Sequence, residues 1–178
     1  ENYEILIMTH IDFERQIFDS TAMYMIGGLF LDPWDVFKVK LALNARLMSL
    51  LTAARLYGDQ LKHLIRKCVP RVNNAGTLVE SILNKEYDQN QEYRFMEGLR
   101  NYVQHRGLPI HYISSHMGWT ETSEDGLLEY SMDFGAQKLY LEEDEAFKKS
   151  VINESPAEID LISMTRGYVE SFSKMHEA

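Results

Sequence analysis

The sequence has a single cysteine, Cys68, among its 178 residues. A lone cysteine excludes a disulfide within the chain and a zinc site built from several thiolates. It fits a reducing compartment, so we expect a cytoplasmic protein. No apolar run approaches the roughly 20 residues that a membrane-spanning helix needs, and we expect no membrane association. The first ten residues lack the basic and then apolar pattern of a secretion signal.

Basic residues are also in the minority, because 18 Lys and Arg face 27 Asp and Glu and the net charge is −9. This excess of acid argues against indiscriminate binding to nucleic acid. The bases are concentrated, however: residues 36–79 hold eight of them and one acid, a net charge of +7, which leaves −16 for the rest. Such polarity fits either a positive face on an acidic body or a solvated helix face with acidic neighbours.

Apolar residues at steps of three and four predict helices over residues 3–26, 34–68 and 77–105, the last with a break near 88–90. Short links make successive helices antiparallel. The packing face predicted for the first helix is formed by Ile7, Ile11, Phe18, Ala22 and Met25, with Phe13 and Ile17 alongside.

The pattern changes after Gly107, where residues 108–136 alternate and are rich in aromatic and β-branched side chains. This is typical of a β-hairpin, with its turn at 123–126. A last helix is predicted to begin at Ser155, which precedes a proline and a capping glutamate. The fold class is therefore mainly α: one domain, residues 1–178, formed by an antiparallel bundle of four to five helices with an inserted β-hairpin.

The segment GLRNYVQHRGLP, Gly98–Pro109, combines polar groups that are suited to phosphodiester chemistry. Asn101 and His105 share one face of a helix, Arg100 lies one step round, and Gln104 sits above Arg100. An imidazole can exchange protons with a ribose hydroxyl near neutral pH. A guanidinium can hold a phosphate by two parallel hydrogen bonds. The other interpretation is a solvated helix end, where Arg and His favour the negative end of the dipole.

The letters RNYVQH resemble the R-N-x-x-x-H form of the HEPN signature, and the resemblance extends over about residues 34–107. It implies a metal-independent endoribonuclease of a toxin–antitoxin or phage-defence system, without a cofactor, which acts as a homodimer with a shared cleft. By this resemblance Arg100 and His105 are catalytic and Asn101 assists them. Gly107 stands where toxins modified by a nucleotidyltransferase antitoxin carry a tyrosine, which argues against a partner of that kind.

The resemblance also leaves two alternatives open. Some relatives of this kind no longer cleave RNA and bind a nucleotide or a protein partner instead. The third interpretation is a structural or regulatory dimer whose motif is a helix cap.

Further residues are predicted to line the cleft from the motif helix and from the long basic helix before it. The expected partners of the protein are RNA, a second copy of the chain and an antitoxin or other protein. No metal site is expected, because no acid or cysteine stands at ligand spacing from the histidines. The predicted substrate-binding residues are Arg46, Arg55, Gln104 and Arg106, and the predicted supporting polar residues are Asn44 and Asp59.

Overall fold

A computed structural model describes the chain over residues 1–27, 32–68, 75–120, 126–143 and 147–177. The described part is mainly helical, as predicted, and it carries a small antiparallel sheet. The elements follow in the order α1 (Asn2–Gly27), α2 (Pro33–Cys68), α3 (Ala75–Gln89), α4 (Gln91–His105), β1 (Tyr112–Trp119), β2 (Leu128–Gln137), α5 (Lys138–Glu142), α6 (Lys149–Glu154), β3 (Glu158–Asp160) and α7 (Leu161–Glu177).

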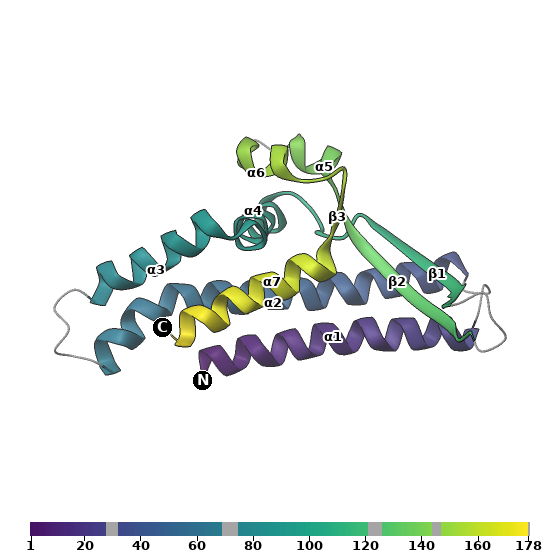
Figure 1. Ribbon diagram of the computed structural model, residues 1–178, viewed down its shortest axis with the longest axis horizontal. Coiled ribbons are helices and arrows are strands. Elements are labelled where there is room, and N and C mark those ends of the chain that lie inside the picture. The colour runs from purple at the N-terminus through teal and green to yellow at the C-terminus, as the bar shows by residue number, and fades with distance from the viewer. Residues whose placement is uncertain (28–31, 69–74, 121–125, 144–146, 178) are drawn as a thin grey trace.

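The long helices α1 and α2 run antiparallel to each other, and α7 lies along them (Figure 1). The core is largest on α2, where Leu43, Leu47 and Leu50 are fully buried. The predicted break before the motif is confirmed, because Asn90 caps α4 by accepting a hydrogen bond from the Tyr93 amide at 3.0 Å. Figure 1 shows α4 nearly end-on, so it crosses the long helices and does not continue along α2.

The face predicted to pack α1 is right only in part, because Phe13 is buried and Ile7 and Ile17 pack against the core, whereas three other predicted residues are exposed. Ile11, Phe18 and Met25 are 42%, 73% and 53% exposed, whereas Leu6 and Phe13 are completely buried. Residues five apart on a helix lie about 140° apart around its axis, so Phe13 and Phe18 point in nearly opposite directions. Apolar residues lie on more than one face of α1 at helical spacing, so periodicity alone did not separate the buried ones from the exposed ones.

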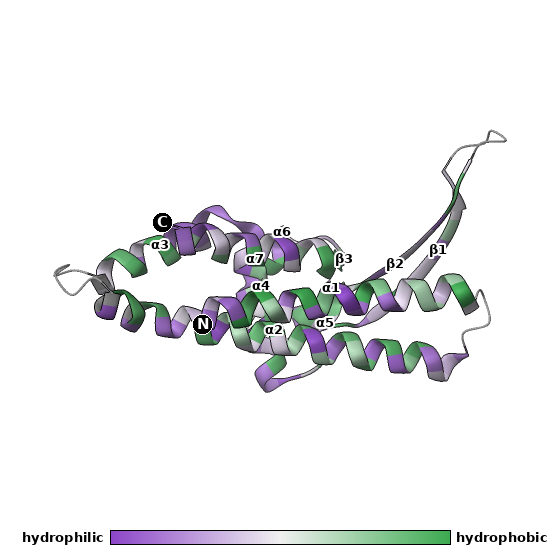
Figure 2. Cartoon of the chain, turned by 90° about the horizontal axis from the view of Figure 1, so that it is seen from below, coloured by the Kyte–Doolittle hydropathy of each residue, from purple (hydrophilic) through white to green (hydrophobic). Residues whose placement is uncertain are grey.

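The predicted hairpin is present as β1 and β2, which pair antiparallel from Tyr112 opposite Gly135 to Trp119 opposite Leu128. Most of the turn expected at 123–126 lies outside the described residues. Figure 2 shows the two strands extending away from the helices as an arm. A third strand, β3, was not expected; it pairs with the base of β2 at residues 135–137.

The last helix begins later than predicted. Ser155 is the C-cap of α6 and not the N-cap of α7: its backbone amide donates to the Ile152 carbonyl at 3.0 Å and its hydroxyl donates to the Val151 carbonyl at 2.9 Å. Asp160 caps α7 instead, accepting from the amide of Ile162 at 2.8 Å. Residues 158–160 pair with β2 as β3, which satisfies their backbone groups before α7 begins.

Asn44 fixes the chain where α4 gives way to the hairpin. It is 1% exposed; its side-chain oxygen accepts from the amide of Ile110 at 3.0 Å, and its amide donates to the carbonyl of Lys40 at 2.8 Å. Asn44→Ala would leave the buried Ile110 amide without this partner, which costs about 1–3 kcal/mol. We expect a lower Tm in a thermal melt.

The matched control for this prediction is Asn84→Ala, because Asn84 is exposed on α3. It should change the unfolding free energy by less than about 0.5 kcal/mol. An Asn44→Ala protein as stable as this control would contradict the assigned role.

None of the described helices is long and apolar enough to cross a membrane.

Candidate functional site

The motif lies on α4, which is wedged between α7 and the short helix α6. Its buried side chains are Tyr93, Phe95, Met96 and Leu99. Gly98 allows Phe147, which precedes α6, to come close, because a β-carbon at this position would lie 2.8 Å from the Phe147 ring. The packing face of α4 is thereby fixed on one side, and the polar residues of the motif lie along its remaining surface.

Arg100 is held by side chains of its own helix. Its Nη1 donates to Gln104 Oε1 at 3.0 Å and its Nη2 donates to Asn101 Oδ1 at 2.6 Å. Its side chain is only 12% exposed. As the four-residue spacing predicts, Gln104 lies against Arg100. The two outer nitrogens of the guanidinium therefore meet neutral amide oxygens.

The inner nitrogen of Arg100 faces a carboxylate that was not among the predicted site residues. Glu97 Oε2 lies 3.6 Å from Arg100 Nε, and the two side chains are 19% and 12% exposed. The other oxygen of Glu97 accepts a hydrogen bond from the Tyr168 hydroxyl of α7 at 2.6 Å. Burial raises the pKa of Tyr168 well above its usual value, and the nearby Glu97 charge raises it further. Tyr168 therefore remains a neutral donor.

His105 is the last residue of α4, and its side chain is exposed. Within the described part of the chain no hydrogen bond or ion pair holds its ring. Arg106 follows as the C-cap, and its backbone amide donates to the Tyr102 carbonyl at 2.8 Å. The imidazole is therefore free to meet a ligand, or a second molecule, at the helix end.

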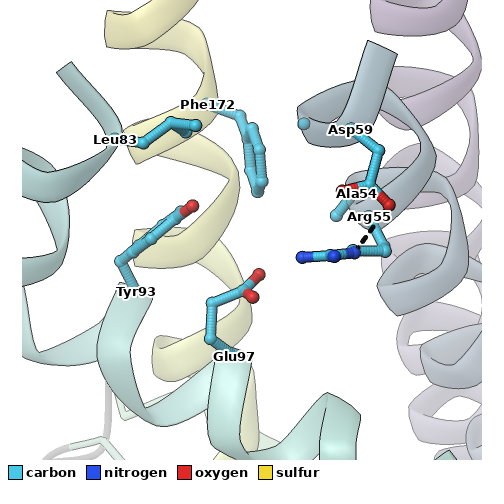
Figure 3. Close-up of a pocket in the computed structure, with 8 residues that line it drawn as sticks. Ala54, Arg55, Asp59, Leu83, Tyr93, Glu97 and Phe172 are labelled. Carbon is cyan, nitrogen blue, oxygen red and sulfur yellow. Dashed lines mark ion pairs between the residues drawn. The ribbon is translucent and has the colours of Figure 1, made fainter. Parts of the chain in front are cut away.

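Of the predicted α2 residues, Arg55 and Asp59 lie near the motif. They form an ion pair of 2.7 Å and line a cavity of about 310 Å³ that Tyr93 and Glu97 close from α4. Figure 3 shows the Arg55 guanidinium extending toward the Glu97 carboxylate across this cavity. Glu97 thus lies between two cations, Arg100 and Arg55.

The other two α2 residues are placed differently. Arg46 is exposed on α2. Asn44 is buried, and both ends of its amide are bonded to the backbone. Any effect of Asn44 on a site would pass through the chain segment at Ile110.

A second, smaller cavity opens on the other side of the motif. It has a volume of about 180 Å³ and is lined by Asn101, Arg94 and Lys148, among others. Arg94 forms an ion pair with Glu154, with 3.0 Å between Nη2 and Oε2. The ammonium of Lys148 lies 4.5 Å from the centre of the Tyr87 ring. Lys148 is thus a cation beside Asn101 that the sequence pattern did not reveal.

Comparison with protein-family models, with curated proteins and with solved structures gives no match. Across the described ranges, no cluster of three or more His, Cys, Asp or Glu side chains could hold a metal ion. The assignment of a function therefore depends on the geometry around α4.

The sequence contained a signal for Glu97 but none for Tyr168. Glu97 precedes Arg100 by three residues, a spacing that places two side chains on one face of a helix. Tyr168 lies 71 residues beyond Glu97 in the chain. Only the packing of α7 against α4 brings the two together.

Proposed function

We propose that this protein is a metal-independent endoribonuclease of HEPN type, in which Arg100 binds the scissile phosphate and His105 transfers protons. The observation that carries the proposal is the state of the Arg100 guanidinium. Both of its outer nitrogens donate to neutral amides of Asn101 and Gln104. Phosphate oxygens can replace amide oxygens as acceptors with a gain in hydrogen-bond strength, because a charged acceptor binds more strongly.

The chemistry needs no component besides RNA and the protein. The 2′-hydroxyl loses its proton to an imidazole, its oxygen forms a bond to phosphorus, and the bond from phosphorus to the 5′-oxygen breaks. A protonated imidazole gives a proton to the leaving 5′-oxygen. The products are a 2′,3′-cyclic phosphate and a 5′-hydroxyl. Arg100 stabilises the charge that develops on the phosphate oxygens.

The reaction needs one imidazole that accepts a proton and one that donates a proton. A twofold-related copy of the chain would supply the second imidazole. His105 is exposed at the end of α4, where a neighbouring molecule can reach it. Arg46, Arg55, Arg106 and Gln104 are the proposed contacts with the RNA backbone, with Asn44 and Asp59 in support. A toxin–antitoxin or phage-defence setting, with a protein that restrains the activity, is part of the same proposal.

The purified protein, incubated with bulk RNA in the presence of a chelator, tests this function. We expect cleavage fragments that end in a 2′,3′-cyclic phosphate. Intact RNA in chelator, or fragments that end in a 3′-hydroxyl, would contradict the proposal.

A second candidate is a module of the same type that binds a nucleotide or a partner without cleaving. The 12% exposure of Arg100 favours it, since a guanidinium packed against its own helix presents little surface to a long polymer. A nucleotide that raises the Tm of the wild-type protein but not of Arg100→Ala, together with intact RNA, would support this candidate.

A further inference from the structure

We propose that Glu97 and Tyr168 are positioning residues for Arg100: Tyr168 anchors the Glu97 carboxylate, and the carboxylate orients the guanidinium through its Nε. This inference rests on the proposed function, because it gives the two residues a role in the action of Arg100 on phosphate. Neither residue contacts RNA in this scheme.

The three nitrogens of the Arg100 guanidinium have different neighbours. Nη1 donates to Gln104 and Nη2 donates to Asn101. Nε is buried, makes no hydrogen bond with any described residue and lies 3.6 Å from Glu97 Oε2. A carboxylate on the Nε side fixes the plane of the guanidinium. The outer edge of the guanidinium, formed by Nη1 and Nη2, is the edge that can hold two phosphate oxygens. Its present acceptors are neutral amide oxygens, which a phosphate can displace.

The Glu97 carboxylate is itself held in place. Glu97 Oε1 accepts from the Tyr168 hydroxyl at 2.6 Å, and Tyr168 is 0% exposed. The Tyr168 ring is held in turn by Tyr93 and Phe172, whose ring centres lie 5.5 Å and 5.0 Å away. A glutamate on a helix surface samples several rotamers, and this hydrogen bond to a buried ring selects one of them.

Two arginines lie near the Glu97 carboxylate. Arg55 reaches toward the same carboxylate across the cavity (Figure 3), but it is also paired with Asp59 at 2.7 Å. Among the residues that the structure describes, Arg100 contacts no carboxylate besides that of Glu97. Loss of the Glu97 charge should therefore affect Arg100 more than Arg55.

The competing explanation is that Glu97 serves only to satisfy the buried Tyr168 hydroxyl. Glu97→Gln separates the two, because the Gln carbonyl oxygen still accepts from Tyr168 while the charge on the Arg100 side is lost. Tyr168→Phe removes the anchor and keeps the packed ring. Glu92→Gln is the matched control, since Glu92 also lies on α4 and contacts α7 at Gly167.

The experiment has one arm that does not depend on cleavage. In ¹⁵N–¹H spectra of arginine Nε–H groups, the signal of Arg100 is assigned by its loss in Arg100→Lys. We expect this signal to exchange slowly with water in the wild type and in Glu92→Gln, and on the order of 10-fold faster in Glu97→Gln. An unchanged exchange rate in Glu97→Gln would overturn the inference, whether or not the protein cleaves RNA.

The second arm measures cleavage in single and double variants. We expect Glu97→Gln to lower the rate on the order of 10-fold and Tyr168→Phe about 3- to 10-fold. In an Arg100→Lys background, Glu97→Gln should have an effect of less than about twofold, because residues that act through one another are not additive. Equal effects of Glu97→Gln in both backgrounds would show a purely structural role. A wild-type protein without activity would remove the proposed function and leave the spectra to decide the contact.

Discussion

Replacing His105 with alanine should abolish RNA cleavage and leave the protein folded. The loss should be about 10²- to 10⁴-fold, the usual contribution of a positioned proton-transfer group. The exposed ring makes no hydrogen bond or ion pair within the described part of the chain. Its removal should therefore change the unfolding free energy by less than about 0.5 kcal/mol. Cleavage rates and a denaturant titration of the same preparation measure both quantities.

The matched control for this prediction is His63→Ala, since His63 is also exposed, on α2. It should cleave RNA at the wild-type rate. A His105→Ala protein that retains full activity would remove the proposed mechanism. A His105→Ala protein that fails to fold would instead favour a role as a helix cap.

Replacing Arg100 should have a comparable effect on activity for a different reason. Arg100→Ala removes the donors that stabilise the developing phosphate charge, and we expect a loss of about 10²- to 10³-fold in the cleavage rate. Arg100→Lys should recover little of it, because an ammonium is a point charge that cannot form two parallel hydrogen bonds. Rates at saturating and at low RNA concentration separate the loss of catalysis from the loss of binding.

Unlike His105, Arg100 has contacts whose loss affects stability. Arg100→Ala removes the nearer of the two cations beside the Glu97 carboxylate, at 3.6 Å, which costs about 1–2 kcal/mol for a group that keeps its hydrogen bond with Tyr168. Arg166→Ala is a suitable control, because it breaks an ion pair of 2.7 Å with Glu14 that lies outside the proposed site. An Arg100→Ala protein that is folded and fully active would contradict the role of the guanidinium.

The sequence predicted those helices and strands whose bounds depend on residues close by in the chain. The break before α4 follows from Asn90, whose side chain caps the helix, and the hairpin follows from alternation between two turn signals. The exposed face of α1 and the late start of α7 were missed because both depend on tertiary packing. Phe18 and Phe13 are equally apolar, and only the tertiary packing, which includes the Phe134 ring of β2 at 5.7 Å from that of Phe13, determines that Phe13 is the buried one.

In the candidate site, too, contacts within one helix were predicted from the sequence and contacts between helices were not. Spacing along one helix predicted that Gln104 would lie against Arg100, and Gln104 accepts a hydrogen bond from it. Asn101, predicted to share a face with His105, also accepts one from Arg100. Arg100 and His105 are five residues apart, which turns the side chains about 140° from each other, and no bond joins them. The contact of Tyr168 with Glu97 could not be predicted, because it requires that the two helices α4 and α7 cross at these residues.

Mixing two inactive variants tests most directly whether two chains share one catalytic groove. An Arg100→Ala chain still carries His105, and a His105→Ala chain still carries Arg100. If the groove is formed across a twofold axis, unfolding and refolding the two variants together should produce mixed dimers that cleave RNA in chelator, while each variant alone remains inactive. A refolded mixture that contains mixed dimers and is as inactive as its components would contradict the shared groove.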